Sequence, residues 1–189
     1  DSAAASDEYE RGVQEGGAYV KRMDSVDKYT LMALDRFPND VDFYMQRGSA
    51  MLYMKDYKGA LRAYDQALKH APSDSVRSVI QGARGDVYYQ TLDTRRSYAS
   101  YDRALKYNPD NVLVLNNYAY YLSVVDRDLD KALKMAARVM ELEPGNATYI
   151  DTYAWVLYKM GRYEEAKKSM QQAIALDSRG SSELFLHYG

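Results

Sequence analysis

The chain has 189 residues, 47% of them hydrophobic, and a formal net charge of −2. This balance lacks the basic excess of a phosphate-binding surface, so we expect no nucleic-acid partner. The absence of cysteine excludes disulfides, thiol nucleophiles and Cys-ligated zinc. No run approaches the roughly 18 apolar residues of a membrane span, so we expect no direct membrane insertion of this segment.

The N-terminal stretch "DSAAASDEYE" is small and polar and has no signal-peptide pattern. It also lacks an initiating Met. We therefore expect the chain to be a processed or trimmed piece of a longer protein, in which residues 1–6 form a disordered stub.

One pattern recurs along the rest of the chain. The pattern begins with a small residue. A bulky residue, or in one copy a second small one, follows four positions later, and Ala or Val three positions after that. A residue that ends the helix, usually Pro, comes next. Ala60, Tyr64, Ala67 and Pro72 show it clearly. Steps of four and three place these residues on one face of a helix, and Pro ends the helix. Each copy is preceded by a second helical stripe, and short turns join the two.

In chain order, the sequence predicts five helix pairs. The first, a degenerate copy, follows the repeat pattern poorly, and the next four follow it clearly. In the degenerate copy the weak pattern Val26, Thr30, Ala33, Pro38 marks the second helix, and Gly16-Gly17 interrupts the first. Residues 75–77 are extra, and the fourth pair contains one inserted residue. We take 7–180 as one array and 181–189, "SSELFLHYG", as the start of a truncated further repeat. The registers are 7–40, 41–74, 78–111, 112–146 and 147–180.

This spacing, on a 34-residue period, resembles the tetratricopeptide repeat (TPR) family. The match in 147–180 is close to the family consensus. The segments "NNYAYYLS", "EPGNATYIDTYAW" and "GRYEEAK" together also resemble bacterial multi-repeat TPR envelope lipoproteins. The resemblance implies an all-α, right-handed superhelical solenoid of antiparallel helix pairs, stabilised by stacking. It also implies a bacterial cell envelope or periplasmic location, with the cytoplasm as the alternative.

Packing explains most of the aromatic residues. Ala154, Ala166 and Ala173 are expected at close helix contacts, with Leu157 and Met170 filling the gaps. The tyrosines predicted to be core are Tyr64, Tyr101, Tyr118 and Tyr153. Arg47 and Arg84 replace a usual Leu, and we expect their stems to cover apolar surface while their heads reach water.

In TPR arrays the first helix of each pair lines a concave groove, and the resemblance places an aromatic and amide-bearing set there. The carboxylate clamp of chaperone-tail TPRs is absent, because the fifth repeat positions hold Met45, Gly82, Asn116 and Asp151. Aromatic side chains with polar tips suit peptide recognition. Trp155 has an alternative, which is packing on the next repeat. The predicted groove residues are Asn116, Asn117, Tyr120, Asp151, Trp155, Tyr158, Tyr89, Asp86 and Tyr53.

No constellation for catalysis, a cofactor or a metal stands out. Asp126, Asp128 and Asp130 have calcium-loop spacing, but Lys131 and Ala137 stand where an EF-hand needs Gly and Glu. The two histidines, His70 and His187, are too far apart in sequence for a convincing site.

The sequence therefore predicts a non-enzymatic scaffold that binds a protein or peptide in the groove. Two alternatives remain open. The chain could be a structural module that self-associates through its terminal repeats, or a regulatory arm of a larger protein whose enzymatic domain lies elsewhere.

Overall fold

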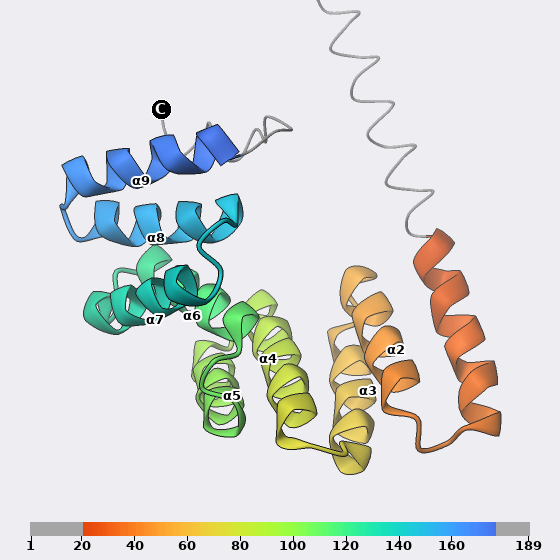
Figure 1. Cartoon of the computed structure of the whole chain (residues 1–189). Helices are drawn as coiled ribbons and strands as arrows, with labels where there is room; N and C mark the ends of the chain where they lie inside the picture. The colour runs from red at the N-terminus through yellow and green to blue at the C-terminus, as the bar shows by residue number, and fades with distance from the viewer. Residues whose placement is uncertain (1–20, 177–189) are drawn as a thin grey trace, which may run out of the picture. The chain divides into compact units, whose positions relative to one another are not determined.

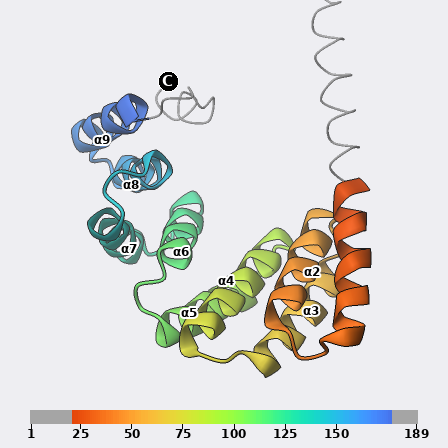
Figure 2. The ribbon, with the colours of Figure 1, turned by 45° about the vertical axis from the view of Figure 1, so that its right-hand side comes forward.

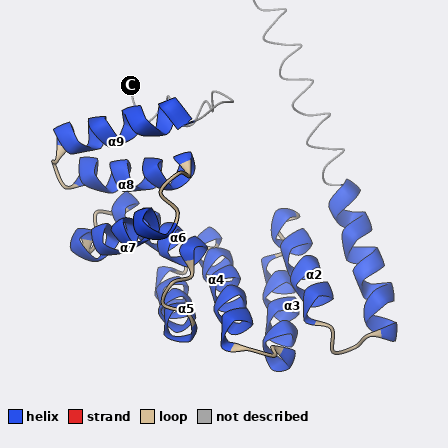
Figure 3. Ribbon diagram, in the orientation of Figure 1, coloured by secondary structure: helices blue, strands red, loops and turns tan. Residues whose placement is uncertain are grey.

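The computed structural model describes residues 21–176, which consist of helices and short connections without any strand (Figures 1 and 3). The all-α prediction is confirmed over this range. The predicted stub at 1–6, the first helix of 7–40 and the truncated repeat at 181–189 lie outside the described residues. Residues 21–36 are helical. The helices that follow are α2 (Val41–Tyr53), α3 (Tyr57–His70), α4 (Asp74–Gln90), α5 (Thr94–Tyr107), α6 (Val112–Val124), α7 (Leu129–Leu142), α8 (Ala147–Lys159) and α9 (Tyr163–Leu176).

The chain divides into two compact units, residues 1–100 and 101–189, and the division falls inside α5. In the first unit α3 packs against both α2 and α4. In the second, α6 packs against α7 and α8, α7 against α8, and α8 against α9. Figures 1 and 2 show the α2/α3 and α8/α9 pairs side by side.

Helix α4 absorbs the three residues that the repeat pattern leaves over. It begins at Asp74, and the Ser73 hydroxyl accepts the Val76 N–H at 3.3 Å as its N-cap. Residues 75–77 therefore form part of an additional turn at the start of the helix. As a result α4 has 17 residues, whereas α2, α6 and α8 have 13 each.

In the pairs that the structure describes completely, the turn between the two helices has the same backbone construction. After α2, Lys55 has φ 62°, its N–H donates to Leu52 O, and the Asp56 N–H donates to Met51 O. These two bonds define a Schellman motif, which ends a helix with one left-handed residue. Asp56 then caps α3 by accepting the Gly59 N–H at 2.9 Å. The equivalent left-handed residues in the later turns are Leu92, Asp126 and Gly161.

The turn between α6 and α7 contains the inserted residue. Asp126 (φ 52°) closes the Schellman motif, and Arg127 follows it. One position later Asp128, also left-handed at φ 45°, accepts the Lys131 N–H and caps α7. A second left-handed residue thus accommodates the insertion while α6 and α7 stay paired.

The first unit is built on a close approach of α2 and α3. The Tyr64 ring is fully buried against Gly48, where even a Cβ atom would overlap the ring. The Tyr64 hydroxyl lies 3.3 Å from Ser49 Oγ. Burial raises the pKa of Tyr64, and this hydrogen bond opposes the rise. The core around Tyr64 consists of Met51, Ala60, Ala67, Ala71, Ile80 and Val87.

In α5 the small packing positions are serines. Ser97 is fully buried, and its hydroxyl donates to Gly85 O of α4 at 3.0 Å. Ser100 is also buried and donates to Arg96 O. Each hydroxyl is therefore satisfied at a site where an unpaired polar group would cost stability.

In the second unit the predicted core tyrosines behave differently from one another. Tyr101 and Tyr118 are buried, with ring centroids 5.1 Å apart, whereas Tyr153 is only half-buried. Lys131 Nζ donates to the Tyr118 hydroxyl at 2.9 Å and to Asp102 at 3.0 Å. Burial opposes the charge on Lys131, but these two contacts more than offset it and raise its pKa. The alanines predicted at close contacts, Ala154, Ala166 and Ala173, are all buried.

The two arginines at the usual Leu position pair with acids instead of only reaching water. Arg47 Nε lies 2.7 Å from Asp27 of the preceding helix. In the next repeat, Arg84 lies 3.2 Å from Asp65 of the preceding helix α3. An Asp on a second helix and an Arg about 20 residues later thus connect successive repeats in the first unit.

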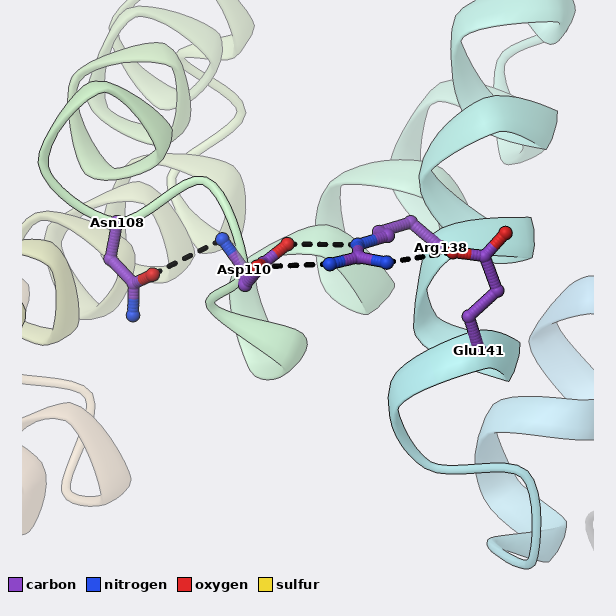
Figure 4. A network of polar contacts seen from close by, with 4 residues as sticks. All are labelled: Asn108, Asp110, Arg138 and Glu141. Carbon is purple, nitrogen blue, oxygen red and sulfur yellow. Dashed lines mark hydrogen bonds and ion pairs between the residues drawn. The ribbon is translucent and has the colours of Figure 1, made fainter.

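A fork of ion pairs fixes the loop before α6 (Figure 4). Arg138 of α7 donates to both Asp110 oxygens, at 2.8 and 3.0 Å, and to Glu141 at 2.7 Å. The Asp110 N–H donates to Asn108 Oδ1 at 3.1 Å. Hydrogen bonding to Arg138 lowers the pKa of Asp110.

We expect Gly48→Ala to destabilise the chain by about 1–3 kcal/mol, because the fully buried Tyr64 ring has no room to retreat. Gly145→Ala is the matched control, since nothing lies within 4 Å of its Cβ position. Urea unfolding followed by circular dichroism measures both. Equal stability of the two variants would contradict the close approach of α2 and α3.

We expect Leu92→Gly to raise stability by about 0.5 kcal/mol. Relief of the left-handed strain, worth about 1–2 kcal/mol, exceeds the entropy that glycine adds to the unfolded chain. Leu92 is 87% exposed, so little packing is lost. Thr91→Gly, at a residue with φ −92°, should instead lower stability by about 1 kcal/mol. Opposite shifts in thermal midpoint support the turn geometry, and shifts of the same sign argue against it.

We expect Arg138→Gln to raise the pKa of Asp110 toward that of an unperturbed aspartate. Because this pKa is lower in the folded chain than in the unfolded chain, the pair stabilises the fold at neutral pH, and that contribution is lost as the pH falls through the folded-state pKa. A carbon-detected NMR titration of the Asp110 carboxyl measures the shift. Lys134→Gln, an exposed change on the same helix, is the control and should leave the titration unchanged.

Candidate functional site

Six of the nine predicted groove residues lie on α6 and α8, two helices that pack against each other in the second unit. On α6, Leu113, Asn117, Tyr120 and Val124 follow helical spacing along one face. On α8, the same spacing aligns another four residues. We call these two stripes together the α6/α8 surface. The α8 stripe consists of Thr148, Asp151, Trp155 and Tyr158.

The α8 stripe carries a pair of stacked aromatic rings. Trp155 and Tyr158 have centroids 5.6 Å apart and planes inclined by 21°. Trp155 is half-buried, while Tyr158 is 52% exposed. The stack holds Trp155 against the protein and leaves much of Tyr158 available to a partner.

Tyr163 adds a third ring, tilted by 59° against Tyr158, and was not among the predicted residues. Its ring lies 5.4 Å from Tyr158, and the residue is 61% exposed. Gly161, with φ 77°, reverses the chain between them and brings the first residue of α9 beside the end of α8. The signal was present in "GRYEEA", where Tyr follows the turn. We call Trp155, Tyr158 and Tyr163 the aromatic strip.

One lysine supports the strip. Lys159 Nζ lies 5.7 Å from the Trp155 ring centroid and 2.8 Å from Asp126 Oδ1. The cation therefore contacts the indole and an acid of the α6–α7 turn together, which limits the freedom of both side chains.

Two of the carboxylates with calcium-loop spacing have other contacts in the structure. Asp126 is engaged by Lys159, and Asp128 caps α7 through the Lys131 N–H. Across residues 21–176 no group of three or more His, Asp or Glu side chains is arranged to hold a metal ion. Of the histidines, His70 lies in this range, and its ring stacks on Tyr44 at 6.2 Å.

The α6 stripe is less exposed in the middle than at its ends. Leu113 is 61% exposed and Val124 is also exposed. Between them Tyr120 is half-buried, with its ring 5.8 Å from that of Tyr121. The stripe therefore presents apolar ends around an aromatic and amide centre.

Asn116 lies deeper than a surface residue. It is 8% exposed, and its Oδ1 is buried with no hydrogen-bond partner among the described residues. Its Nδ2 lies 3.5 Å from Asn117 Oδ1, which is long for a hydrogen bond. A buried amide oxygen without a partner is uncommon in folded proteins.

The other three predicted residues belong to the first unit. Tyr53, at the end of α2, is exposed, and Asp86 and Tyr89 on α4 are half-buried. The structure therefore groups six predicted residues on two contacting helices and leaves these three on a different unit.

The α6/α8 surface is suited to binding. Its aromatic, amide and apolar side chains offer contact area and hydrogen bonds. Asp151 is the one ionisable acid in the two stripes. None of the helices in the described part of the chain combines the length and apolar character needed to cross a bilayer.

Comparisons with known proteins agree with this architecture. Two family models described as tetratricopeptide repeat match the chain, one at residues 41–74 and 147–179 and the other at 100–134. Together the matches cover more than half of the sequence.

Curated relatives are distant and much longer. The chain is 23% identical over 138 residues to the TPR repeat-containing protein PA4667 of Pseudomonas aeruginosa, covering 71% of this chain and 22% of that protein. It is 29% identical over 94 residues to the STIP1 homolog of Dictyostelium discoideum, covering 50% and 16%. The chain thus spans about a fifth of the length of these relatives.

Among solved structures, that of Pseudomonas aeruginosa pilF has a TM-score of 0.70 at 21% identity, covering 78% of this chain and 65% of that one. The structure of YrrB, described as a TPR protein with an unusual peptide-binding site, has a TM-score of 0.63 at 19% identity, covering 90% and 84%. These likenesses show the fold.

The all-α TPR architecture predicted from the sequence is therefore confirmed. Proteins of this fold generally mediate protein–protein interaction and are generally not enzymes. On the matched repeats and the helix pairs described above, the chain belongs to the tetratricopeptide repeat family.

Proposed function

We propose that this chain is a protein-interaction scaffold that binds a protein or peptide segment on the α6/α8 surface and the aromatic strip that continues from it. The observation that carries the proposal is the aromatic strip, in which two largely exposed tyrosine rings continue from a half-buried tryptophan.

Exposed aromatic rings in contact with one another favour recognition of a chain segment. Tyr and Trp supply large contact area with few rotatable bonds, so little side-chain entropy is lost when a partner orders them. Here that loss is smaller still, because Tyr158 is already held between Trp155 and Tyr163.

Polar groups beside the rings can fix the orientation of a bound segment. Asp151 lies one turn before Trp155 on the same face of α8 and can accept hydrogen bonds from a partner's backbone or cation. The Asn116 amide offers a further contact if its side chain turns outward. The peptide-binding site named for YrrB is consistent with this use of the fold.

We expect peptides selected on this chain from a displayed random library to lose about tenfold or more in affinity for Tyr158→Ser/Tyr163→Ser. The variant removes two exposed rings and little packing. Trp155 is the single Trp of the chain and lies in the strip, so its fluorescence reports the titration directly.

The matched control is Tyr29→Ser/Tyr107→Ser, which removes two other exposed tyrosines. It should bind the selected peptides as the unmodified chain does. Equal affinity of all three proteins would sink the proposal. A mass that rises with protein concentration in light scattering, without peptide binding, would favour the self-associating module instead.

A further inference from the structure

A second surface, confined to the first unit, has a different chemistry. Helices α2 and α3 lie side by side (Figures 1 and 2), and between them opens a depression of about 610 Å³. Its lining residues are Tyr44, Arg47, Met51, Gly59, Arg62, Ala63, Asp65, Gln66 and Lys69. None of them belongs to the α6/α8 surface.

The depression has an apolar floor. Met51, Gly59 and Ala63 are buried where α2 and α3 meet. A Cβ atom at Gly59 would lie 2.7 Å from Met51 Sδ, so the missing side chain lets the sulfur lie close to the α3 backbone. An apolar side chain of a partner would find carbon and sulfur atoms there.

The rim is basic, and its charges are unevenly compensated. Arg47 is paired with Asp27, and Asp65, the acid of the rim, is paired with Arg84. Arg62 and Lys69 have no ion pair within residues 21–176; Lys69 contacts only the neutral Gln66, at 3.3 Å. Two uncompensated cations therefore remain on the rim.

The distance between Arg62 and Lys69 allows both to bind carboxylates of one extended peptide. Arg62 and Lys69 are seven residues apart on α3, which separates them by about 10 Å along one face of the helix. Three residues of an extended chain span about the same distance. Arg62 can also bind a carboxylate through two parallel hydrogen bonds.

We propose that this depression binds an acidic peptide segment of a partner protein, with two carboxylates on Arg62 and Lys69 and one large apolar side chain between them on the floor. The charge complementarity selects an acidic segment. The apolar floor favours a peptide over a nucleic acid, and the chain's net charge of −2 does not offer an extended phosphate-binding surface.

The test is a selection of peptides on a variant whose aromatic strip has been removed, so that peptides binding there are not enriched. The bait is the full chain carrying Tyr158→Ser/Tyr163→Ser, panned against a displayed random peptide library. Peptides that also bind the same bait with Arg62→Glu/Lys69→Glu are removed. We expect the remaining peptides to carry at least two acidic residues flanking one large apolar residue.

One selected peptide is then measured by fluorescence anisotropy. Arg62→Glu/Lys69→Glu should weaken it about tenfold or more, because like charges are placed against its carboxylates. Replacing its acids by Gln, or its apolar residue by Ser, should weaken it as well. The matched control, Arg95→Glu/Lys106→Glu, changes the net charge equally at two exposed residues of α5 and should stay within about twofold.

Several outcomes would overturn the proposal. They are enrichment of peptides without acids, equal loss of affinity in the control, and preferential binding of a single-stranded oligonucleotide. Binding of a peptide of residues 1–20 in place of the selected peptides would indicate an occupant from this chain itself. Because the two surfaces carry separate variants, failure here leaves the function proposed for the α6/α8 surface untouched, and the reverse also holds.

Discussion

The close approach of paired helices is the constraint on which the other features depend. In the first unit it is set by Gly48, whose missing side chain is the space that the Tyr64 ring occupies. In α5 the same need for a small residue is met by Ser97, and in the last pair by Ala154 and Ala173. The described pairs are also joined by short turns, and at each of these turns a left-handed residue ends the first helix.

Packing leaves parts of the helix surfaces exposed, and these parts are available for polar and aromatic chemistry. The second unit presents an aromatic strip with Lys159 beside its tryptophan ring, and the first presents an apolar floor between cations. The same fold thus supports surfaces that differ in the partner they favour. The scaffold supplies position, and the residues outside the packing stripes supply selectivity.

Much of the fold could be predicted because its signals are local. The steps of three and four residues, the prolines after α3 and α5, and the turn at Gly161 all depend on neighbours in the sequence. The first residue of α4 was harder to predict. The repeat period places the start of this repeat at residue 78, whereas Ser73 is an N-cap residue and starts the helix at Asp74. The local N-cap signal therefore determined the helix start, and the repeat period did not.

The candidate site was less predictable because it depends on contacts across turns. Helical projection identified Trp155 and Tyr158, but Tyr163 joins them only through the chain reversal at Gly161. Projection also treated Asn116 as a surface residue, whereas neighbouring side chains cover it almost completely. Ion pairing of Arg47 and Arg84 with particular acids likewise required the positions of the preceding helices.

Those two pairs bear on how the chain avoids misfolding. Similar repeats risk docking in the wrong order, either within one molecule or by exchange between molecules during synthesis. A helix pair that skipped its proper neighbour would leave Arg47 without Asp27, or Asp65 without Arg84, in half-covered positions. An unmatched charge in such a partly covered position costs stability, so the two pairs favour the order of repeats seen in the first unit.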